Sequence, residues 1–561
     1  MVGLFSTRRA AIALIAAAGL LVPAIGPAQA HTSATSAHAG AGVLIYPQEP
    51  NTSLWPKNLD PALPTDFDSN QVISLIYSGL VKLNGQNQVV PDLAAAMPTI
   101  SSDRLTYTFK LRPNLKFSDG TPLVASDFVY SLTRTLSKAE ASPLGMLYDG
   151  HIKGAADLNS GKVKTLAGIQ APDDSTVVIT LDKPISYFLE TLTYPTADVL
   201  KPNVKPGEDL VGPNAQANNI GTGPFMFSRA WRYRSEMYFK PNPYWYNASK
   251  MKLKEIDMPF IGADTTAYAE YQSGQIPVVA VPVSDLTSAQ HQSDFHTGPL
   301  LQIDYISPNL GSDKTCKPLT CAPFNDIHFR RALMYAVDQK TIDNVILHGS
   351  EKPLCSLVPV GIVGTDDKDL CPLSSYNPTR AKAELALAKK DYGGKLPNDG
   401  SFSVIYPSGS QALTNEYVEL QNEWNAVGIN INITSTPLNN WYTLVSANYT
   451  PFLTNGWIDD YPDPQDFAEN LLLSTSPYDV GNFKSAAYDK LMAQADLTPN
   501  GPDRTALYVQ AQKLAINAVA YIMIGQVYAN FRWKSNLHGF YLSSSYEFQP
   551  VNQDWTNASV S

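Results

Sequence analysis

Four aspartates lie close together in one short stretch of the chain: Asp459, Asp460, Asp463 and Asp466. The chain has no lysine or arginine between Lys395 and Lys484, so these carboxylates lack a local counter-charge. Carboxylates in that situation need solvent, a metal ion or a cation delivered from outside. Trp457 and Tyr461 stand beside them and offer flat, apolar surface. The stretch therefore predicts a binding site for a ligand that carries a positive charge on an organic body.

A strand and a turn must position these carboxylates. The apolar residues of 452–458 indicate the end of a strand, and the prolines that follow indicate a turn. A helical pattern opens at Asp466. Turns and helix starts favour aspartate for local hydrogen bonding, so Asp459, Asp463 and Asp466 are expected to shape the turn and cap the helix.

Helices and strands alternate from Asn325 onward. A strand at 402–406, a helical stripe over 413–424 and a strand at 429–433 form a crossover, which predicts a parallel sheet covered by helices. Ligands of such sheets lie beyond the strand ends. The turn at 457–460 is therefore expected at that edge if its strand joins the sheet.

Local sequence signals also predict two helix caps and several further strands. Asp326 and Asn377 are expected to cap helices, because each precedes a helical pattern and Asn377 is followed by proline. The segment 88–213, made of strands and one helix, could form a small lobe of its own. Further strands are expected at 105–112, 177–181 and 521–524, the last followed by an irregular tail.

The first thirty residues have the three parts of an export signal: Arg8-Arg9, an apolar run over 10–22, and Ala28-Gln29-Ala30. The apolar run is shorter than the roughly 20 residues that span a bilayer. We expect a signal peptide cleaved after Ala30, and hence an exported protein in the periplasmic space or at the cell exterior. Residues 31–42 are expected to form a flexible lead.

Composition narrows the class of protein. With 561 residues, of which 44% are hydrophobic, the chain is expected to form two or three domains. A net charge of −10 disfavours nucleic acid and anionic membrane as partners. An even number of cysteines in an exported chain indicates disulfides, and pairing of sequence neighbours is the simplest of three connectivities. The cysteines are Cys316, Cys321, Cys355 and Cys371. No histidine stands beside them at zinc-ligand spacing, and no metal or cofactor is expected.

A series of motifs runs through the chain in order. They are LRPNLKFSDGTPL at 111–123, DFVYS at 127–131, GTGPF at 221–225, NPYW at 242–245, FND at 324–326, RRAL at 330–333 and AVD at 336–338. Together they resemble solute-binding family 5, the peptide-binding receptors of ABC importers, which includes oligopeptide, dipeptide and nickel receptors. The resemblance covers nearly the whole mature chain.

This resemblance implies an α/β, two-lobed fold of the periplasmic-binding-protein type II with an extra inserted domain. The lobes would be joined by a hinge around a ligand cleft. Lobe I is expected from 43–87, 214–302 and 521–561, the inserted domain from 88–213, and lobe II from 303–520. The family also implies a monomeric, non-enzymatic receptor that delivers its ligand to the permease subunits of an ABC transporter, with the ATPase on separate chains.

The resemblance also implies roles for individual residues. In the family, an aspartate in a Trp-x-x-Asp turn holds the α-ammonium group of the peptide, and that position here is Asp460. A peptide bound as an added strand would pair with the backbone of Gly456, Trp457 and Ile458. The second backbone contact is expected in the other lobe, at Thr65, Asp66 and Phe67. Where some oligopeptide receptors have a tyrosine after a Ser-Pro pair, this chain has Leu144 after Ser142-Pro143, and the nearby Tyr148 is the candidate instead. Tyr461, which stands beside the acids of the turn, completes the expected substrate-binding residues.

One departure affects the ligand. Dipeptide receptors resembling this chain use an arginine for the peptide's C-terminal carboxylate in the loop that is 407–413 here, and this loop has no basic residue. Longer peptides, or a different cationic ligand, are therefore favoured. The alternatives are a nickel chelate or an oligosaccharide bound by the same fold, and a secreted glycoside hydrolase, because aromatic surface and paired carboxylates also suit sugar cleavage.

Overall fold

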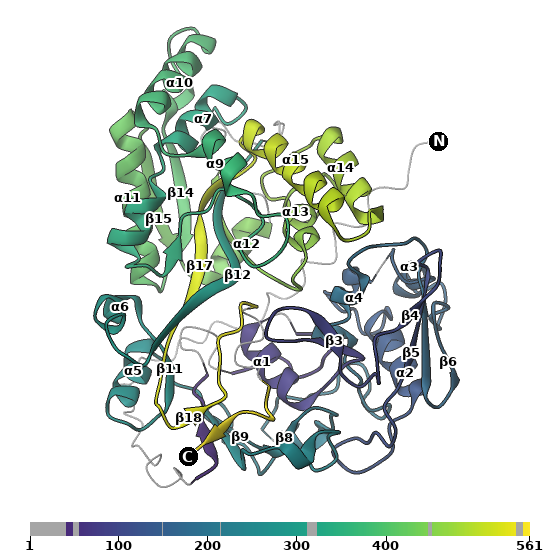
Figure 1. Ribbon diagram of the computed structural model, residues 1–561. Helices are drawn as coiled ribbons and strands as arrows, with labels where there is room; N and C mark the ends of the chain where they lie inside the picture. The colour runs from purple at the N-terminus through teal and green to yellow at the C-terminus, as the bar shows by residue number, and fades with distance from the viewer. Residues whose placement is uncertain are drawn as a thin grey trace, which may run out of the picture. The chain divides into compact units, whose positions relative to one another are not determined.

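The computed structural model describes residues 41–48, 55–64, 66–148, 150–213, 215–310, 323–446, 452–545 and 554–561 (Figure 1). The expected signal peptide, nearly all of the expected flexible lead, Thr65, Cys316 and Cys321 lie outside these ranges. Within them, no helix combines the length and the apolar composition that crossing a bilayer demands.

A four-stranded sheet contains the first strand of the chain. Its order is β1–β10–β9–β8, with β1 parallel to β10 and the other pairs antiparallel. The strands are β1 (Val43–Ile45), β8 (Phe225–Phe227), β9 (Glu236–Pro241) and β10 (Glu255–Pro259). Helix α1 (Phe67–Ile76) packs against β8. A hydrophobic core around this sheet draws on three distant parts of the chain, with members such as Leu44, Phe239 and Trp555.

A second, antiparallel sheet has the order β4–β5–β7–β6. Its strands are β4 (Thr99–Ile100), β5 (Thr106–Lys110), β6 (Ile169–Asp173) and β7 (Thr176–Thr180), and α2 (Ala125–Thr135) packs on it. Alternation buries Tyr107 and Phe109 on one face, as the sequence predicts. Nearby elements are the hairpin β2 (Val81–Leu83) and β3 (Val89–Pro91), and helices α3 (Ala155–Asn159) and α4 (Phe188–Thr191). The core of this region runs from Leu80 to Val199 and includes Tyr461.

Two long antiparallel strands, β12 (Phe295–Pro308) and β17 (Ile522–Trp533), run side by side through the molecule (Figure 1). They form the centre of a sheet with the order β11–β17–β12–β16, in which β13 also pairs with β17. The other strands are β11 (Val278–Ala280), β13 (Glu351–Lys352) and β16 (Phe452–Ile458). Leu300 belongs to the core of the first sheet and Leu301 to the core of the helical part that follows, so β12 passes from one core to the other.

The helical part is built on β14 (Phe402–Pro407) and β15 (Ile431–Thr436), which pair in parallel. Its helices are α7 (Ile327–Ala336), α8 (Gln339–Thr341), α9 (Asp367–Ser374), α10 (Pro378–Asp391), α11 (Gln411–Val427), α12 (Leu438–Ser446), α13 (Pro464–Leu472), α14 (Ala486–Leu497) and α15 (Pro502–Ala518). Two short helices, α5 (Asp264–Gln272) and α6 (Val283–Ala289), lie next to β11. The small strands β18 (Leu537–His538) and β19 (Ser559–Val560) lie near the C-terminus. The predicted caps are confirmed: Asp326 accepts from the N–H of Phe329, and Asn377 from that of Arg380.

Three expectations change. The crossover from β14 through α11 to β15 is confirmed, but within the described ranges its parallel ladder contains only those two strands. The strand before the acidic turn, β16, pairs instead with β12 in the antiparallel sheet, because long-range register decides its partner. The strand predicted at 521–524 continues to Trp533, and the tail that follows contains β18 and β19 rather than being wholly irregular.

The cysteine pairing is confirmed where it can be seen. Cys355 and Cys371 form a disulfide with their Cα atoms 5.1 Å apart. Cys371 lies in α9, so the bond ties this helix to the segment that follows β13. The expected Cys316–Cys321 pair lies outside the described residues.

Candidate functional site

The acidic turn begins where β16 ends. Its first residue, Asp459, is fully buried, and its N–H donates to the carbonyl of Leu301 over 3.0 Å. Oδ2 of Asp459 accepts from the hydroxyl of Ser545 over 2.7 Å. Asp459 therefore fastens the turn to β12 and to the C-terminal tail, in agreement with the structural role expected from the sequence.

Asp463 caps α13, where its carboxylate accepts from the N–H of Gln465 over 2.9 Å. The same carboxylate forms a two-point ion pair with Arg504 of α15, at 2.7 and 2.8 Å. Both side chains are buried, so this charge has a full partner that lies 41 positions further along the chain. The turn has no counter-charge nearby in the sequence, but the inference that its carboxylates need solvent, a metal ion or an outside cation is wrong for Asp463, because Arg504 supplies the charge.

Asp466 is also fully buried and accepts three hydrogen bonds. Its donors are the indole Nε1 of Trp457 at 3.1 Å, the N–H of Asp460 at 2.9 Å and the side-chain amide of Asn470 at 2.9 Å. Burial and the neighbouring carboxyl of Asp460 raise the pKa of Asp466 well above its ordinary value. Asp466 therefore holds the backbone of the turn and the Trp457 ring in place.

Asp460 differs from the other three aspartates. Among the described residues, its carboxyl group has no hydrogen-bond or ion-pair partner, although it is mostly withdrawn from solvent. Burial alone raises the pKa of Asp460 to about 7. A carboxyl group that is mostly withdrawn from solvent and has no partner is costly unless a donor or cation from outside completes it. Asp460 is thus the acid of this turn that is arranged to meet a ligand.

Aromatic rings surround this carboxyl. The ring of Trp457 meets that of Tyr478 edge-on, with centroids 5.1 Å apart. Tyr461 is buried in the core of the β4–β7 region, where it stacks with Tyr187 at 6.1 Å. Burial raises the pKa of Tyr148 and of Tyr461, and the carboxyl of Asp460 adds to both rises, so both predicted tyrosines lie near Asp460.

Both of these tyrosine side chains already have partners inside the protein. The hydroxyl of Tyr148 is 3.1 Å from the carbonyl of Thr191 and 2.8 Å from the hydroxyl of Thr196. The hydroxyl of Tyr461 donates to the side chain of Gln465. The two rings therefore form walls behind Asp460, whereas Trp457 is partly exposed beside it.

The backbone that was predicted to pair with an extended ligand lies at the end of its sheet. Gly456, Trp457 and Ile458 form the last residues of β16, with Gly456 exposed. Among the described residues, the sheet order places β12 on one side of β16 and no strand of that sheet on the other. Such an edge offers unpaired N–H and C=O groups to an added strand.

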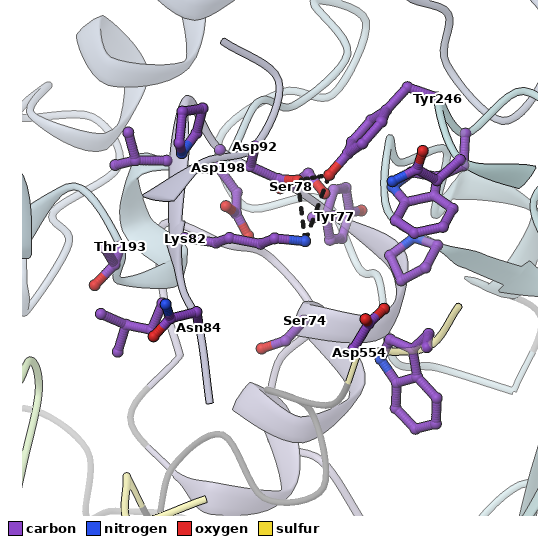
Figure 2. Close-up of a pocket in the computed structure, with 18 of the residues that line it drawn as sticks. Ser74, Tyr77, Ser78, Lys82, Asn84, Asp92, Thr193, Asp198, Tyr246 and Asp554 are labelled. Carbon is purple, nitrogen blue, oxygen red and sulfur yellow. Dashed lines mark hydrogen bonds and ion pairs between the residues drawn. The ribbon is translucent and has the colours of Figure 1, made fainter. Parts of the chain in front are cut away.

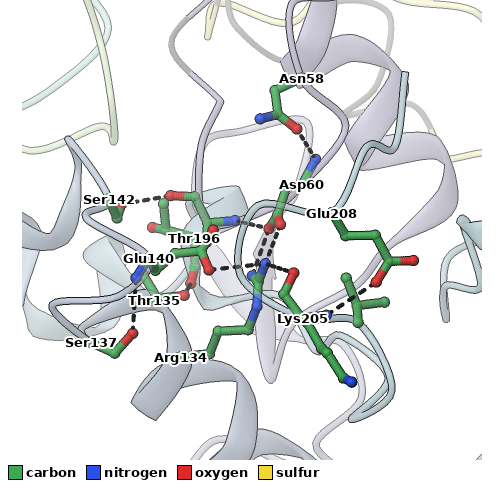
Figure 3. A network of polar contacts seen from close by, with 12 residues as sticks. Asn58, Asp60, Arg134, Thr135, Ser137, Glu140, Ser142, Thr196, Lys205 and Glu208 are labelled. Carbon is green, nitrogen blue, oxygen red and sulfur yellow. Dashed lines mark hydrogen bonds and ion pairs between the residues drawn. The ribbon is translucent and has the colours of Figure 1, made fainter. Parts of the chain in front are cut away.

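The second predicted contact lies at the start of α1. Asp66 caps this helix and accepts from both the N–H and the hydroxyl of Ser69, at 3.0 and 2.8 Å, and Phe67 is its first residue. The preceding loop is fixed by Asp60, which pairs with Arg134 of α2 (Figure 3). Arg134 also pairs with Glu140 at 3.0 Å, so a buried charge network holds the loop rigid.

A cavity of about 380 Å³ lies elsewhere, between α1, the β2–β3 hairpin and the C-terminal tail. None of the predicted site residues that the structure describes lines it. Figure 2 shows Lys82, Asp92 and Tyr246 joined there, with Lys82 Nζ 3.6 Å from Asp92 and the Tyr246 hydroxyl donating to Asp92 over 2.6 Å. Because these groups satisfy one another, this cavity is a weaker candidate than the Asp460 turn.

Sequence reasoning missed a smaller, acidic cavity beside Gly456. Asp304 of β12 and Glu416 of α11 line it. One signal was present in the sequence: Glu416 is three residues after Leu413 and four before Leu420, so it lies on the apolar stripe of its helix. Among the described residues, no group of three or more histidine, cysteine or acidic side chains is arranged to hold a metal ion.

Comparison with known proteins gives a consistent result. The model of the bacterial extracellular solute-binding proteins, family 5, middle part, matches residues 88–479. The chain is 28% identical over 471 residues to the probable deoxycholate-binding periplasmic protein YgiS of Escherichia coli K12, covering 82% of this chain and 83% of that one. It is also 28% identical over 478 residues to the dipeptide-binding protein of Lactococcus lactis, covering 83% and 86%.

The structure shows the same fold as a solved binding protein. It superposes on the murein tripeptide binding protein MppA of Escherichia coli with a TM-score of 0.75 and 24% identity, covering 93% of this chain and 99% of that one. The fold is therefore the mixed α/β, two-lobed binding-protein fold that the motifs imply.

Proposed function

Because this chain belongs to the bacterial extracellular solute-binding proteins of family 5, we propose that it is the peptide receptor of an ABC importer. In this proposal, an oligopeptide binds between the lobes with its α-ammonium group on Asp460. The observation that carries it is the carboxyl of Asp460, which alone among the four aspartates of the turn has no partner among the described residues. A charge-assisted hydrogen bond between this carboxyl and an ammonium group contributes about 1.5–3 kcal/mol to the free energy of binding.

The rest of the site fits an extended ligand. The edge of β16 at Gly456–Ile458 would pair with the peptide backbone, and Trp457 would cover the first residue. Thr65, Asp66 and Phe67 would supply the second contact from the other lobe. Tyr148 and Tyr461 would act as walls behind Asp460, since both hydroxyls have internal partners.

The domain boundaries are part of the proposal. We assign lobe I to 43–87, 214–302 and 521–561, the inserted domain to 88–213 and lobe II to 303–520. The separate hydrophobic cores support this division, as does the passage of β12 from one core to the other between Leu300 and Leu301. β12 and β17 would then contain the hinge.

The cellular role follows from the family. The protein would act as an exported monomer, with its signal peptide cleaved after Ala30, and would pass its ligand to permease subunits whose ATPase is on separate chains. Periplasmic relatives such as YgiS support export. The receptor would have no enzymatic activity, because glycoside hydrolysis needs two carboxyl groups free to act, and at this turn the other three aspartates are bound within the protein.

The ligand can be identified directly. The exported protein would be measured by native mass spectrometry, then denatured so that any released molecule can be sequenced. Peptides of a few residues would support the proposal. A sterol, a sugar or a nickel chelate in their place would keep the family and discard the peptide. Cleavage of peptides or glycosides by the pure protein would contradict a receptor function.

A further inference from the structure

A cavity of about 160 Å³ lies beside Gly456, on the same strand as the proposed backbone contacts. Small-molecule sites usually span about 300–1,000 Å³, so this cavity has the size for part of a ligand rather than a whole one. Its walls come from β12, β17, the end of β14, α11, α12 and β16. Its lining residues include Asp304, Glu416, Tyr417, Trp441 and Gly456.

Two carboxyl groups, those of Asp304 and Glu416, line this cavity, and a third, that of Glu351, lies next to Asp304. Asp304 and Glu351 share a hydrogen bond, and Glu416 lies close enough to Asp304 for the two charges to act on each other. Glu416 is only 6% exposed and lines the cavity, yet its carboxyl has no hydrogen-bond partner among the described residues. Oε2 of Glu351 is likewise buried without a partner in that part of the chain. Burial raises the pKa of Glu416 to about 8.

The backbone makes room for this cluster. Both sheet neighbours of Asp304 are glycines, Gly456 on β16 and Gly525 on β17. A Cβ at Gly456 would lie 2.6 Å from Oδ1 of Asp304, and one at Gly525 would lie 2.9 Å from Oε2 of Glu351. Contacts that short do not occur, so side chains at these positions would displace the carboxyl groups. The two glycines therefore leave the space in the sheet that the carboxyl groups occupy.

The protein supplies little positive charge here. The sequence between Lys395 and Lys484, which includes α11, α12 and β16, contains no lysine or arginine. Lys352, next to Glu351, is paired with Asp343 at 3.3 Å. The described residues also offer no grouping suited to a metal ion. The aromatic side chains of Tyr417 and Trp441 line the cavity instead, and aromatic faces attract organic cations.

The cavity and Asp460 are placed so that one extended ligand can reach both. Gly456 is four residues before Asp460, which corresponds to about 13 Å along an extended strand. A peptide in extended form with its α-ammonium on Asp460 would bring a later residue to the level of Gly456. The side chain of that residue would be the part of the ligand that enters the cavity.

We propose that the cavity formed by Asp304, Glu416 and the neighbouring aromatic rings binds a positively charged side chain of the peptide, so that the receptor prefers ligands with lysine or arginine at one internal position. This inference rests on the proposed function, since it assumes a peptide in the cleft. It adds a specificity pocket separate from Asp460 and explains why the loop at 407–413 has no arginine. A C-terminal carboxylate at this place would face the carboxyl groups of Asp304 and Glu416.

The test uses the exported protein and seven tetrapeptides. These are tetra-alanine and its variants with lysine at position 2, 3 or 4, together with the three matching peptides that carry Nε-acetyllysine. Affinities are measured by calorimetric titration at pH 7. At one position, lysine should bind about tenfold or more tightly than acetyllysine, because only the former brings a charge to the buried carboxyls.

Variants assign the preference to the cavity. Glu416→Gln and Asp304→Asn should each bring the ratio of the two affinities close to one. Glu419→Gln, the same change three residues further along α11 and outside the cavity, should leave the ratio as in the wild type. Melting temperatures would verify that each variant folds.

The outcomes separate the two proposals. Equal binding of lysine and acetyllysine peptides at every position, with tetra-alanine still bound, would overturn the acidic pocket and leave the peptide receptor intact. A lysine preference that survives in both Glu416→Gln and Asp304→Asn would overturn the assignment to this cavity. Binding of none of the seven peptides would overturn both the pocket and the proposed function.

Discussion

Gly456 and Asp304 face each other across the β12–β16 pair, and the carboxyl of Asp304 occupies the space that a side chain at 456 would take. This relationship joins the Asp460 site to the acidic cavity lined by Asp304 and Glu416. The same glycine lies at the exposed edge where a ligand strand would pair and beside the acidic cavity.

Replacing Gly456 by alanine is expected to destabilise the protein. The new Cβ would lie 2.6 Å from Oδ1 of Asp304, whose carboxyl is held by Glu351 and Gln302 and cannot move freely. Overpacking of this kind costs about 1–3 kcal/mol in free energy of unfolding, which urea denaturation would measure. The matched control is Gly298→Ala in β12, where the nearest atom lies 3.8 Å away and stability should not fall. Equal losses in the two variants would contradict the close approach.

Arg504 should be far more important for stability than its surface neighbour on α15. Arg504→Ala would leave the buried carboxylate of Asp463 unpaired, which costs about 3–5 kcal/mol. Lys513→Ala on the same helix removes an exposed pair with Asp369 and should cost less than about 1 kcal/mol. Urea unfolding of both variants tests this difference. Similar losses in the two variants would show that Arg504 is not the partner that stabilises the buried carboxylate of Asp463.

The ligand-free protein should lose stability as the pH rises. Burial raises the pKa of Asp460 from its usual 3.8 to about 7, so the folded state holds a proton that the unfolded state releases. That contribution is fully present below about pH 4 and is lost as the pH rises through 7. Asp466, whose pKa is also raised, acts with the same sign, whereas the facing tyrosines Tyr148, Tyr461 and Tyr478 do not titrate in this range.

Melting temperatures between pH 4 and 8 would show this effect. The decline in melting temperature with rising pH should be smaller in Asp460→Asn, which cannot ionise at this position. Peptide affinity should change in the opposite direction and increase up to about pH 7, because ionised Asp460 is the form that attracts an ammonium group. It should fall again above the α-ammonium pKa of about 8. A pH profile unchanged by Asp460→Asn would contradict the raised pKa.

Much of the local structure could be predicted from sequence because its causes are local. Asp326 and Asn377 cap their helices through N–H groups three residues away, and alternation buries Tyr107 and Phe109. The turn containing Asp460 was also predicted, since its aspartates and its Trp-x-x-Asp spacing are adjacent in sequence. The structural roles expected for Asp459, Asp463 and Asp466 are confirmed by their contacts.

The remaining features depend on contacts between distant residues. Arg504 reaches Asp463 across 41 positions, so the sequence around the turn could not reveal its counter-charge. The acidic cavity needs the register that places Asp304 between Gly456 and Gly525, from three different strands. The partner of β16 likewise follows from that register and not from the helix–strand alternation, which suggested a parallel sheet.

The central claim is that Asp460 holds the α-ammonium group of a peptide. The most direct test is calorimetric titration of the exported protein with tetra-alanine and with N-acetyl-tetra-alanine, in the wild type and in Asp460→Asn. Asp503→Asn, an exposed acid at the start of α15, serves as the control. The wild type and Asp503→Asn should bind the free peptide about tenfold or more tightly than the acetylated one, and Asp460→Asn should lose this difference. Equal affinity of the wild type for the two peptides, or a preference that persists in Asp460→Asn, would contradict the claim.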